Sequence, residues 1–197
     1  MKIWRKRFFT RRPLLTVALI FFGFFPAGGA ARAPSGSSPE DDENRKAVYE
    51  MYEGYRKNFP EVAEMAPSEA MERWRKDRVV FIDTRTPEEM AVSTLPGTIS
   101  KEEYLKNPER FSGRTPVAYC TISYRSGMFA REMAEKSRRI LNLRGGMLAW
   151  VWEGGPIFQE DVQTRRMHVY GKKWDLAPAG YETVRFSKWR QLMKSRQ

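Results

Sequence analysis

The chain alternates between short apolar runs and segments whose apolar residues recur every three or four positions. The runs are typical of buried strands and lie at 79–82, 117–119 and 140–143, with a small edge strand expected at 62–63. Helical spacing, capping residues or a leading proline predict helices at 40–58, at 68–74, from Pro87, at 102–105, from Ser126 and at 147–152. Strands that alternate with helices predict an α/β fold with a mostly parallel sheet flanked by helices.

The stretch from Pro116 to Gly127, P-V-A-Y-C-T-I-S-Y-R-S-G, joins one of these strands to the helix that follows it. We expect Ser126 to be the N-cap of that helix. The single cysteine of the chain, Cys120, then lies on a tight loop at the C-terminal edge of the sheet. Open α/β folds carry their functional groups at this edge.

The loop around Cys120 favours an ionised thiol. A helix start offers unpaired backbone N–H groups and a partial positive charge, and Arg125 adds a full charge. A short loop can also direct several amides toward one point and form an anion-binding cradle. The pattern therefore predicts a nucleophile. The alternative is a buried and unreactive thiol, because free cysteine is among the most buried residue types.

Four stretches of the chain form an ordered set. They are V-V-F-I-D-T-R-T-P-E-E at 79–89, L-P-G-T-I at 95–99, the cysteine loop at 120–127 and N-L-R-G-G-M-L-A-W at 142–150. Together they resemble the rhodanese (sulfurtransferase) family over about residues 62–157. Ser123 departs from the family, whose loops usually carry glycine there, and Ser93-Thr94 stands where Gly-His is common. A serine at position 123 either avoids a positive φ or adopts it with some strain.

The resemblance implies a rhodanese-like three-layer fold and a cysteine that carries a sulfane sulfur as a persulfide. On that basis the catalytic residue is Cys120, and the active-site loop that binds substrate consists of Thr121, Ile122, Ser123, Tyr124, Arg125 and Ser126. Asp83 and Arg85 are expected to support the loops through ion pairs rather than to take part in catalysis. Protein tyrosine phosphatases are similar but place one more residue between cysteine and arginine, so the smaller ring here suits a sulfur atom better.

The net charge of +11 is concentrated at the N-terminus. Seven of the 35 Lys and Arg residues and no acidic residue fall within 1–33, so the rest of the chain carries only +4 and nucleic acid is not an expected partner. A basic start, an apolar run at 14–25 and small residues up to 33 predict a signal peptide, or else an uncleaved membrane anchor at 13–30. We expect export to the bacterial periplasm, by the general or the twin-arginine route. The alternative is a domain held outside the cytoplasm by that anchor, which would be its only membrane contact.

Outside the leader, we expect a linker at 34–39, a helical extension at 40–61, the rhodanese-like domain at 62–157 and a basic, aromatic extension at 158–197. The aromatic residues of the last segment are expected to pack on the domain while its lysines stay solvated, and binding of nucleic acid or anionic lipid is the alternative. The lone histidine, His168, gives neither a metal site nor a Cys-His dyad, and no cofactor is expected.

The resemblance, together with the cysteine loop, predicts a sulfurtransferase that moves a sulfane sulfur from thiosulfate or a persulfide to a thiol or cyanide through a persulfide on Cys120. An exported protein with one cysteine forms no internal disulfide and exposes its thiol to oxidation, so we expect a protein persulfide or thiol partner. The alternative function is a non-catalytic, rhodanese-like module of the cell envelope that binds a partner or carries sulfur.

Overall fold

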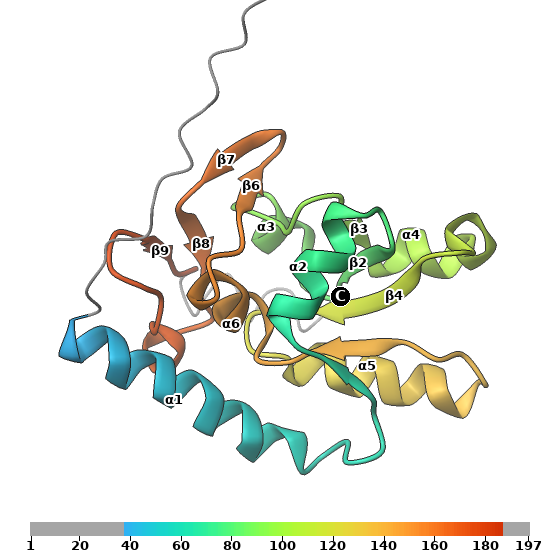
Figure 1. Ribbon diagram of the computed structural model, residues 1–197, viewed down its shortest axis with the longest axis horizontal. Coiled ribbons are helices and arrows are strands. Elements are labelled where there is room, and N and C mark those ends of the chain that lie inside the picture. The colour runs from blue at the N-terminus through green and yellow to red at the C-terminus, as the bar shows by residue number, and fades with distance from the viewer. Residues whose placement is uncertain (1–37, 187–197) are drawn as a thin grey trace, which may run out of the picture. The chain divides into compact units, whose positions relative to one another are not determined.

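The computed structural model describes residues 38–186 (Figure 1). The leader expected at 1–33, most of the linker expected at 34–39 and the last residues of the C-terminal extension lie outside the described residues. Among residues 38–186, no helix combines the length and the apolar character needed to cross a membrane.

The centre of the fold is a five-stranded sheet in the order β1-β5-β4-β2-β3, in which every neighbouring pair is parallel. Its strands are β1 (Glu64–Met65), β2 (Val79–Asp83), β3 (Ile99–Ser100), β4 (Thr115–Tyr119) and β5 (Leu141–Leu143). The predicted α/β class is confirmed. Because the strands run in one direction, their carboxyl ends meet at one edge, where Asp83 of β2 lies in register with Tyr119 of β4.

Helices cover both faces of this sheet. They are α1 (Pro39–Arg56), α2 (Pro67–Arg75), α3 (Pro87–Met90), α4 (Lys101–Lys106), the 3-10 turn η1 (Pro108–Phe111), α5 (Tyr124–Glu135) and α6 (Gly146–Trp152). Side chains alternate along β2, so Val79 and Phe81 join one apolar cluster while Val80 and Ile82 join another. The first cluster includes residues of α2 and α6, and the second includes residues of α4 and α5. This arrangement gives the three layers that the resemblance implied.

The N-terminal helix α1 is held to the C-terminal end of α6. Its start is capped by Ser38, whose Oγ accepts a hydrogen bond of 3.1 Å from the N–H of Asp41. Further along, Arg45 and Tyr49 donate hydrogen bonds of 2.7 and 2.9 Å to Glu153 just after α6. The helix therefore packs on the domain along part of its length.

The C-terminal segment adds small sheets to the domain. It contains the antiparallel pair β6 (Ile157–Gln159) and β7 (Val162–Thr164), the parallel pair β8 (Arg166–His168) and β9 (Glu182–Val184), and the 3-10 turn η2 (Lys172–Trp174). Met167 and Val169 are fully buried in the first apolar cluster, and Trp152 of α6 donates a hydrogen bond of 2.8 Å to the carbonyl of Leu176. Trp174 and Tyr181 also pack there and Lys172 and Lys173 are exposed, as expected, whereas Tyr170 is 47% exposed and departs from the expectation for the aromatic residues.

Several expected boundaries differ from those observed. The edge strand expected at 62–63 lies two residues later, because the N–H of Val62 instead closes a turn onto the carbonyl of Phe59 at 3.1 Å. The helix expected to be capped by Ser68 begins at Pro67 without a side-chain cap. The short strand β3 and the turn η1 have no counterpart among the predicted elements.

Candidate active site

Cys120 directly follows β4 at the carboxyl edge of the sheet, and the loop from Cys120 to Ser123 leads into α5. Thr84, just after β2, donates both its backbone N–H and its hydroxyl to the carbonyl of Tyr119, each at 3.0 Å. These bonds extend the pairing of the two central strands to the residue that precedes the cysteine. The loop therefore begins from a rigid point.

The helix after the loop begins earlier than the sequence predicts. It starts at Tyr124 with Ser123 as its N-cap residue, so the expected N-cap at Ser126 is wrong. Ser126 lies within the first turn, where its hydroxyl donates a hydrogen bond of 2.7 Å to the side chain of Asn142. That buried contact takes up the hydroxyl that a cap would have used.

Ser123, the residue that departs from the family pattern, adopts a left-handed conformation with φ 68° and ψ 6°. Of the two alternatives, the serine therefore accepts a positive φ, at a cost of about 1–2 kcal/mol. Its hydroxyl donates to the carbonyl of Leu143, and its own carbonyl accepts a hydrogen bond of 3.2 Å from the side chain of Asn142. Both partners belong to β5, so the strained residue is fixed to the neighbouring strand.

The start of α6 packs against the loop backbone. The N–H groups of Met147 and Leu148 donate hydrogen bonds of 2.9 and 3.1 Å to the carbonyls of Cys120 and Thr121. Gly146 has φ +62°, and a Cβ placed on it would lie 2.5 Å from the carbonyl oxygen of Cys120 and 2.9 Å from the nitrogen of Ser123. The second glycine of the N-L-R-G-G stretch is thus required both by its conformation and by this close approach.

The amides of the loop remain available. Within residues 38–186, no protein group accepts a hydrogen bond from the backbone N–H groups of Thr121 to Ser126, the last three of which form the first turn of α5. The hydroxyl of Thr121 is also buried without a hydrogen-bond partner in this part of the chain. Since α6 takes up loop carbonyls and leaves the amides unpaired, the loop offers donors to a bound anion.

The thiol itself is buried, with 2% of the surface of Cys120 exposed. Burial is compatible with either interpretation of the cysteine, whereas the unpaired amides and a nearby guanidinium favour the nucleophile. Tyr124, the first residue of α5, is 39% exposed, and its ring centroid lies 5.2 Å from that of Tyr55 in α1. The N-terminal helix thus places an aromatic side chain against the residue that follows the loop. The helical spacing at 40–58 predicts that Tyr55 packs on the domain, but it does not identify Tyr124 as its partner.

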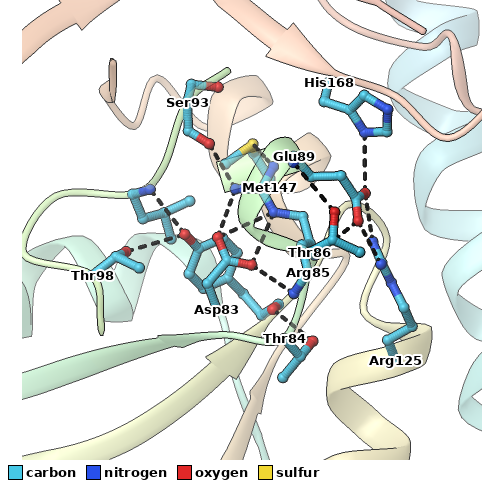
Figure 2. A network of polar contacts seen from close by, with 12 residues as sticks. Asp83, Thr84, Arg85, Thr86, Glu89, Ser93, Thr98, Arg125, Met147 and His168 are labelled. Carbon is cyan, nitrogen blue, oxygen red and sulfur yellow. Dashed lines mark hydrogen bonds and ion pairs between the residues drawn. The ribbon is translucent and has the colours of Figure 1, made fainter. Parts of the chain in front are cut away.

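Arg125 is held by Glu89 and not left free beside the thiol (Figure 2). Its two terminal nitrogens donate to the two carboxylate oxygens at 2.7 and 2.8 Å. Burial alone would lower the pKa of Arg125, but the hydrogen bonds to Glu89 and the charge of Cys120 outweigh burial and raise the pKa. Glu89 follows Thr86 in a capping box that begins α3, so its backbone position was recognisable from the sequence but its partner was not.

His168 completes this contact from the C-terminal segment (Figure 2). Its Nδ1 lies 3.1 Å from a carboxylate oxygen of Glu89, and 1% of its side chain is exposed. Burial would raise the pKa of Glu89, but the contacts with Arg125 and His168 hold this pKa well below its usual range. No signal in the sequence predicted this role for His168, because the contact joins segments that are distant along the chain.

Asp83 and Arg85 form a separate, fully buried ion pair (Figure 2). Arg85 donates to both carboxylate oxygens of Asp83, the shortest contact being 2.6 Å, and also donates to the carbonyl of Ser93 at 2.6 Å. Burial would lower the pKa of Arg85, but the charge of Asp83, the phenol of Tyr119 and the hydrogen bonds to Asp83 together outweigh burial and raise this pKa. Ser93 contributes its backbone carbonyl here, so the departure from Gly-His at 93–94 does not remove this contact.

In the part of the chain from 38 to 186, no three potential metal ligands gather at one place. The arrangement at the carboxyl edge is therefore best described as a buried cysteine on a loop of unpaired amides, with an arginine that is held by a buried carboxylate.

The chain is similar to several known proteins. A family model described as a rhodanese-like domain matches residues 66–153. A sulfurtransferase of Allochromatium vinosum is 36% identical over 84 residues, which are 40% of this chain and 78% of that protein. An uncharacterised protein of Synechocystis is 30% identical over 96 residues, 47% of this chain, and the chain spans only about half of that relative, 54%. The thiosulfate sulfurtransferase of Pseudomonas aeruginosa is a similar solved structure at 19% identity and a TM-score of 0.43, covering 66% of this chain and 25% of that one.

Proposed function

This chain belongs to the rhodanese-like domain family, and on that premise we propose that it is a sulfurtransferase which carries a sulfane sulfur as a persulfide on Cys120. The observation that carries it is the row of amides from Thr121 to Ser126 on the loop of the buried cysteine, which find no hydrogen-bond acceptor within residues 38–186.

The reaction consists of two exchanges at sulfur. The thiolate of Cys120 attacks the sulfane sulfur of thiosulfate or of a persulfide, a new S–S bond forms, and the donor's own sulfur bond breaks with release of sulfite or a thiolate. A thiol or cyanide then attacks the outer sulfur, takes it as a new persulfide or as thiocyanate, and leaves the Cys120 thiolate for the next cycle. No external oxidant or reductant is consumed.

The loop stabilises the charge that both steps carry. The thiolate and the persulfide are anions, and unpaired N–H groups at a helix start bind an anion without reorganising. Arg125 supports this geometry, because its bidentate contact with Glu89 links the first turn of α5 to α3. Thr121, Ile122, Ser123 and Tyr124 provide the uncharged side chains around the cysteine.

We further propose that the domain works outside the cytoplasm. The basic and apolar segment at 1–33 supports export, and a single cysteine is compatible with an oxidising compartment. Cell fractionation of the full-length chain tests this proposal, and recovery of the protein in the cytoplasm would contradict it.

Intact-mass measurement tests the chemistry. The full chain is incubated without oxygen with thiosulfate or with an organic hydropersulfide, and the addition of one sulfur atom is expected in the wild type but not in Cys120→Ser. Added cyanide should then remove the sulfur and yield thiocyanate. No addition from either donor would favour a binding module without transfer chemistry. Turnover of a chromogenic phosphate ester, which we do not expect, would favour a phosphatase.

A further inference from the structure

Arginines follow the carboxyl ends of three neighbouring strands, and each is paired with a carboxylate. Arg85 comes after β2, Arg125 after β4 and Arg144 after β5. Their partners are Asp83 at 2.6 Å, Glu89 at 2.7 Å and Glu53 at 2.8 Å. The sequence places three arginines at this edge of the sheet, but in the folded chain each of them is neutralised by its own carboxylate partner.

The pairing of Arg125 matters most for the reaction, since this arginine belongs to the loop itself. Its guanidinium is engaged with both carboxylate oxygens of Glu89, a residue that is 3% exposed. The Arg125 side chain is 34% exposed, but its carboxylate partner is buried, so the arginine cannot exchange this bidentate contact for an incoming anion without leaving a buried carboxylate unpaired. The site therefore provides amide donors and the hydroxyl of Thr121, but the charge of its loop arginine is already committed.

The two kinds of donor differ in the charge that they bring. With thiosulfate, the Cys120 thiolate must meet a dianion, and sulfite leaves as a dianion. With a hydropersulfide R–S–SH, the thiolate attacks the terminal sulfur, the bond from the cysteine sulfur to that sulfur forms, and the S–S bond of the donor breaks. R–S⁻ leaves with the electron pair, and the proton stays on the transferred sulfur. The second reaction involves a single negative charge throughout, which suits a helix start equivalent to about half a positive charge.

The most exposed side chain beside the loop is aromatic. Tyr124 is the most exposed side chain of the loop region at 39%, and its ring lies against Tyr55 of α1. A ring surface of this kind contacts an organic group better than a strongly hydrated inorganic anion.

We propose that the donor of this site is an organic hydropersulfide whose group next to sulfur is uncharged, and not a doubly charged inorganic donor such as thiosulfate. The inference rests on the proposed sulfur transfer and concerns only which class of donor the site accepts. Glu89 is, in this proposal, the residue that sets the choice, because it neutralises Arg125.

The test compares the rates at which thiosulfate and benzyl hydropersulfide add sulfur to Cys120, followed by intact mass. Glu89→Gln removes the negative charge but keeps an amide oxygen for the capping box of α3, and it frees the charge of Arg125. Loss of the link between α5 and α3 should slow the reactions of both donors alike, so we expect the ratio of the thiosulfate rate to the hydropersulfide rate to rise about tenfold or more. The gain should shrink at high ionic strength. The matched control, Glu53→Gln, frees Arg144 instead and should leave the ratio of the two rates within about twofold.

A second pair of variants does not depend on the buried carboxylate. Tyr124→Lys places an unpaired cation on an exposed position beside the loop, and Tyr124→Met removes the same ring without adding charge. The lysine variant is expected to gain reactivity toward thiosulfate relative to the methionine variant, again by about tenfold.

The outcomes separate this inference from the proposed function. If neither donor adds sulfur to any variant, sulfur transfer itself is wrong. If sulfur is added but the ratio of the rates is the same in Glu89→Gln, Tyr124→Lys and the wild type, transfer stands and charge does not select the donor. A wild type that reacts faster with thiosulfate than with the hydropersulfide would also overturn the inference.

Discussion

Replacing Gly146 by alanine should distort the active-site loop, because the new Cβ has no space. It would lie 2.5 Å from the carbonyl oxygen of Cys120 and 2.9 Å from the nitrogen of Ser123, so backbone atoms must move. The left-handed conformation at φ +62° adds strain of about 1–2 kcal/mol for a residue with a side chain. Overpacking against backbone adds about 1–3 kcal/mol, so the free energy of unfolding should fall by about 2–5 kcal/mol in total.

Gly97 provides a matched control for this substitution. Its φ of +63° is almost the same, but nothing lies within 4 Å of a Cβ placed there. Gly97→Ala should therefore lower the free energy of unfolding only by the strain of the left-handed conformation, about 1–2 kcal/mol, and leave the active-site loop undisturbed. Urea unfolding followed by circular dichroism gives both free energies, and intact mass gives the rate of sulfur addition to Cys120.

The comparison isolates the contact between α6 and the loop. We expect Gly146→Ala to be the less stable variant and the slower to load sulfur, while Gly97→Ala loads sulfur at the rate of the wild type. Equal stabilities and equal loading rates in the two variants would refute the idea that Gly146 shapes the loop through close approach.

Three further predictions concern residues around the site and at α1. Ser123→Ala should lower the free energy of unfolding by about 1–2 kcal/mol, since it keeps the positive φ but leaves the carbonyl of Leu143 without its donor. Ser123→Gly should lower it by less, because glycine removes the strain of the positive φ. Urea unfolding that ranks the two variants in the opposite order would contradict this. His168→Ala removes a contact that keeps the pKa of Glu89 low, so stability should fall at a higher pH during acid titration than in the wild type, and identical acid unfolding would exclude this role. Burial and the hydrogen bond to Glu153 raise the pKa of Tyr49 from 10.0 to about 12, so its proton stabilises the folded state below pH 10 and this contribution is lost as the pH rises toward 12. The stability difference between the wild type and Tyr49→Phe should therefore shrink over that range, and a constant difference would count against it.

The sheet was predictable because its central strands are apolar runs. Burial on both faces makes 79–82 and 117–119 almost continuously apolar, which is the pattern of a strand in a parallel sheet. β3 consists of only two residues, Ile99–Ser100, and so short a strand carries no periodicity to recognise. Its position follows from pairing with β2, which is a tertiary contact.

The site was predictable as far as local chemistry reaches. The loop, its cysteine and the glycines at 145–146 can be read from the sequence, since each is a local requirement of a turn or a helix start. The N-cap prediction was wrong because a serine at 126 has the usual chemistry of a cap. The chain instead uses a left-handed serine at 123 as the N-cap residue, and the hydroxyl of Ser126 donates a hydrogen bond to the side chain of Asn142. Glu89, His168 and Tyr55 act through partners that are far away along the chain, and no pattern within their own segments identifies those partners.

The contact of His168 with Glu89 has a practical consequence for anyone who shortens this protein. A version trimmed to residues 66–153 would keep the cysteine loop but discard β8, together with Met167 and Val169, which are fully buried. The cut would also remove Tyr55 and expose apolar side chains of α6 to water. Such a fragment should aggregate and lacks the contact of His168 with Glu89, so a negative assay on it would say little about the intact chain.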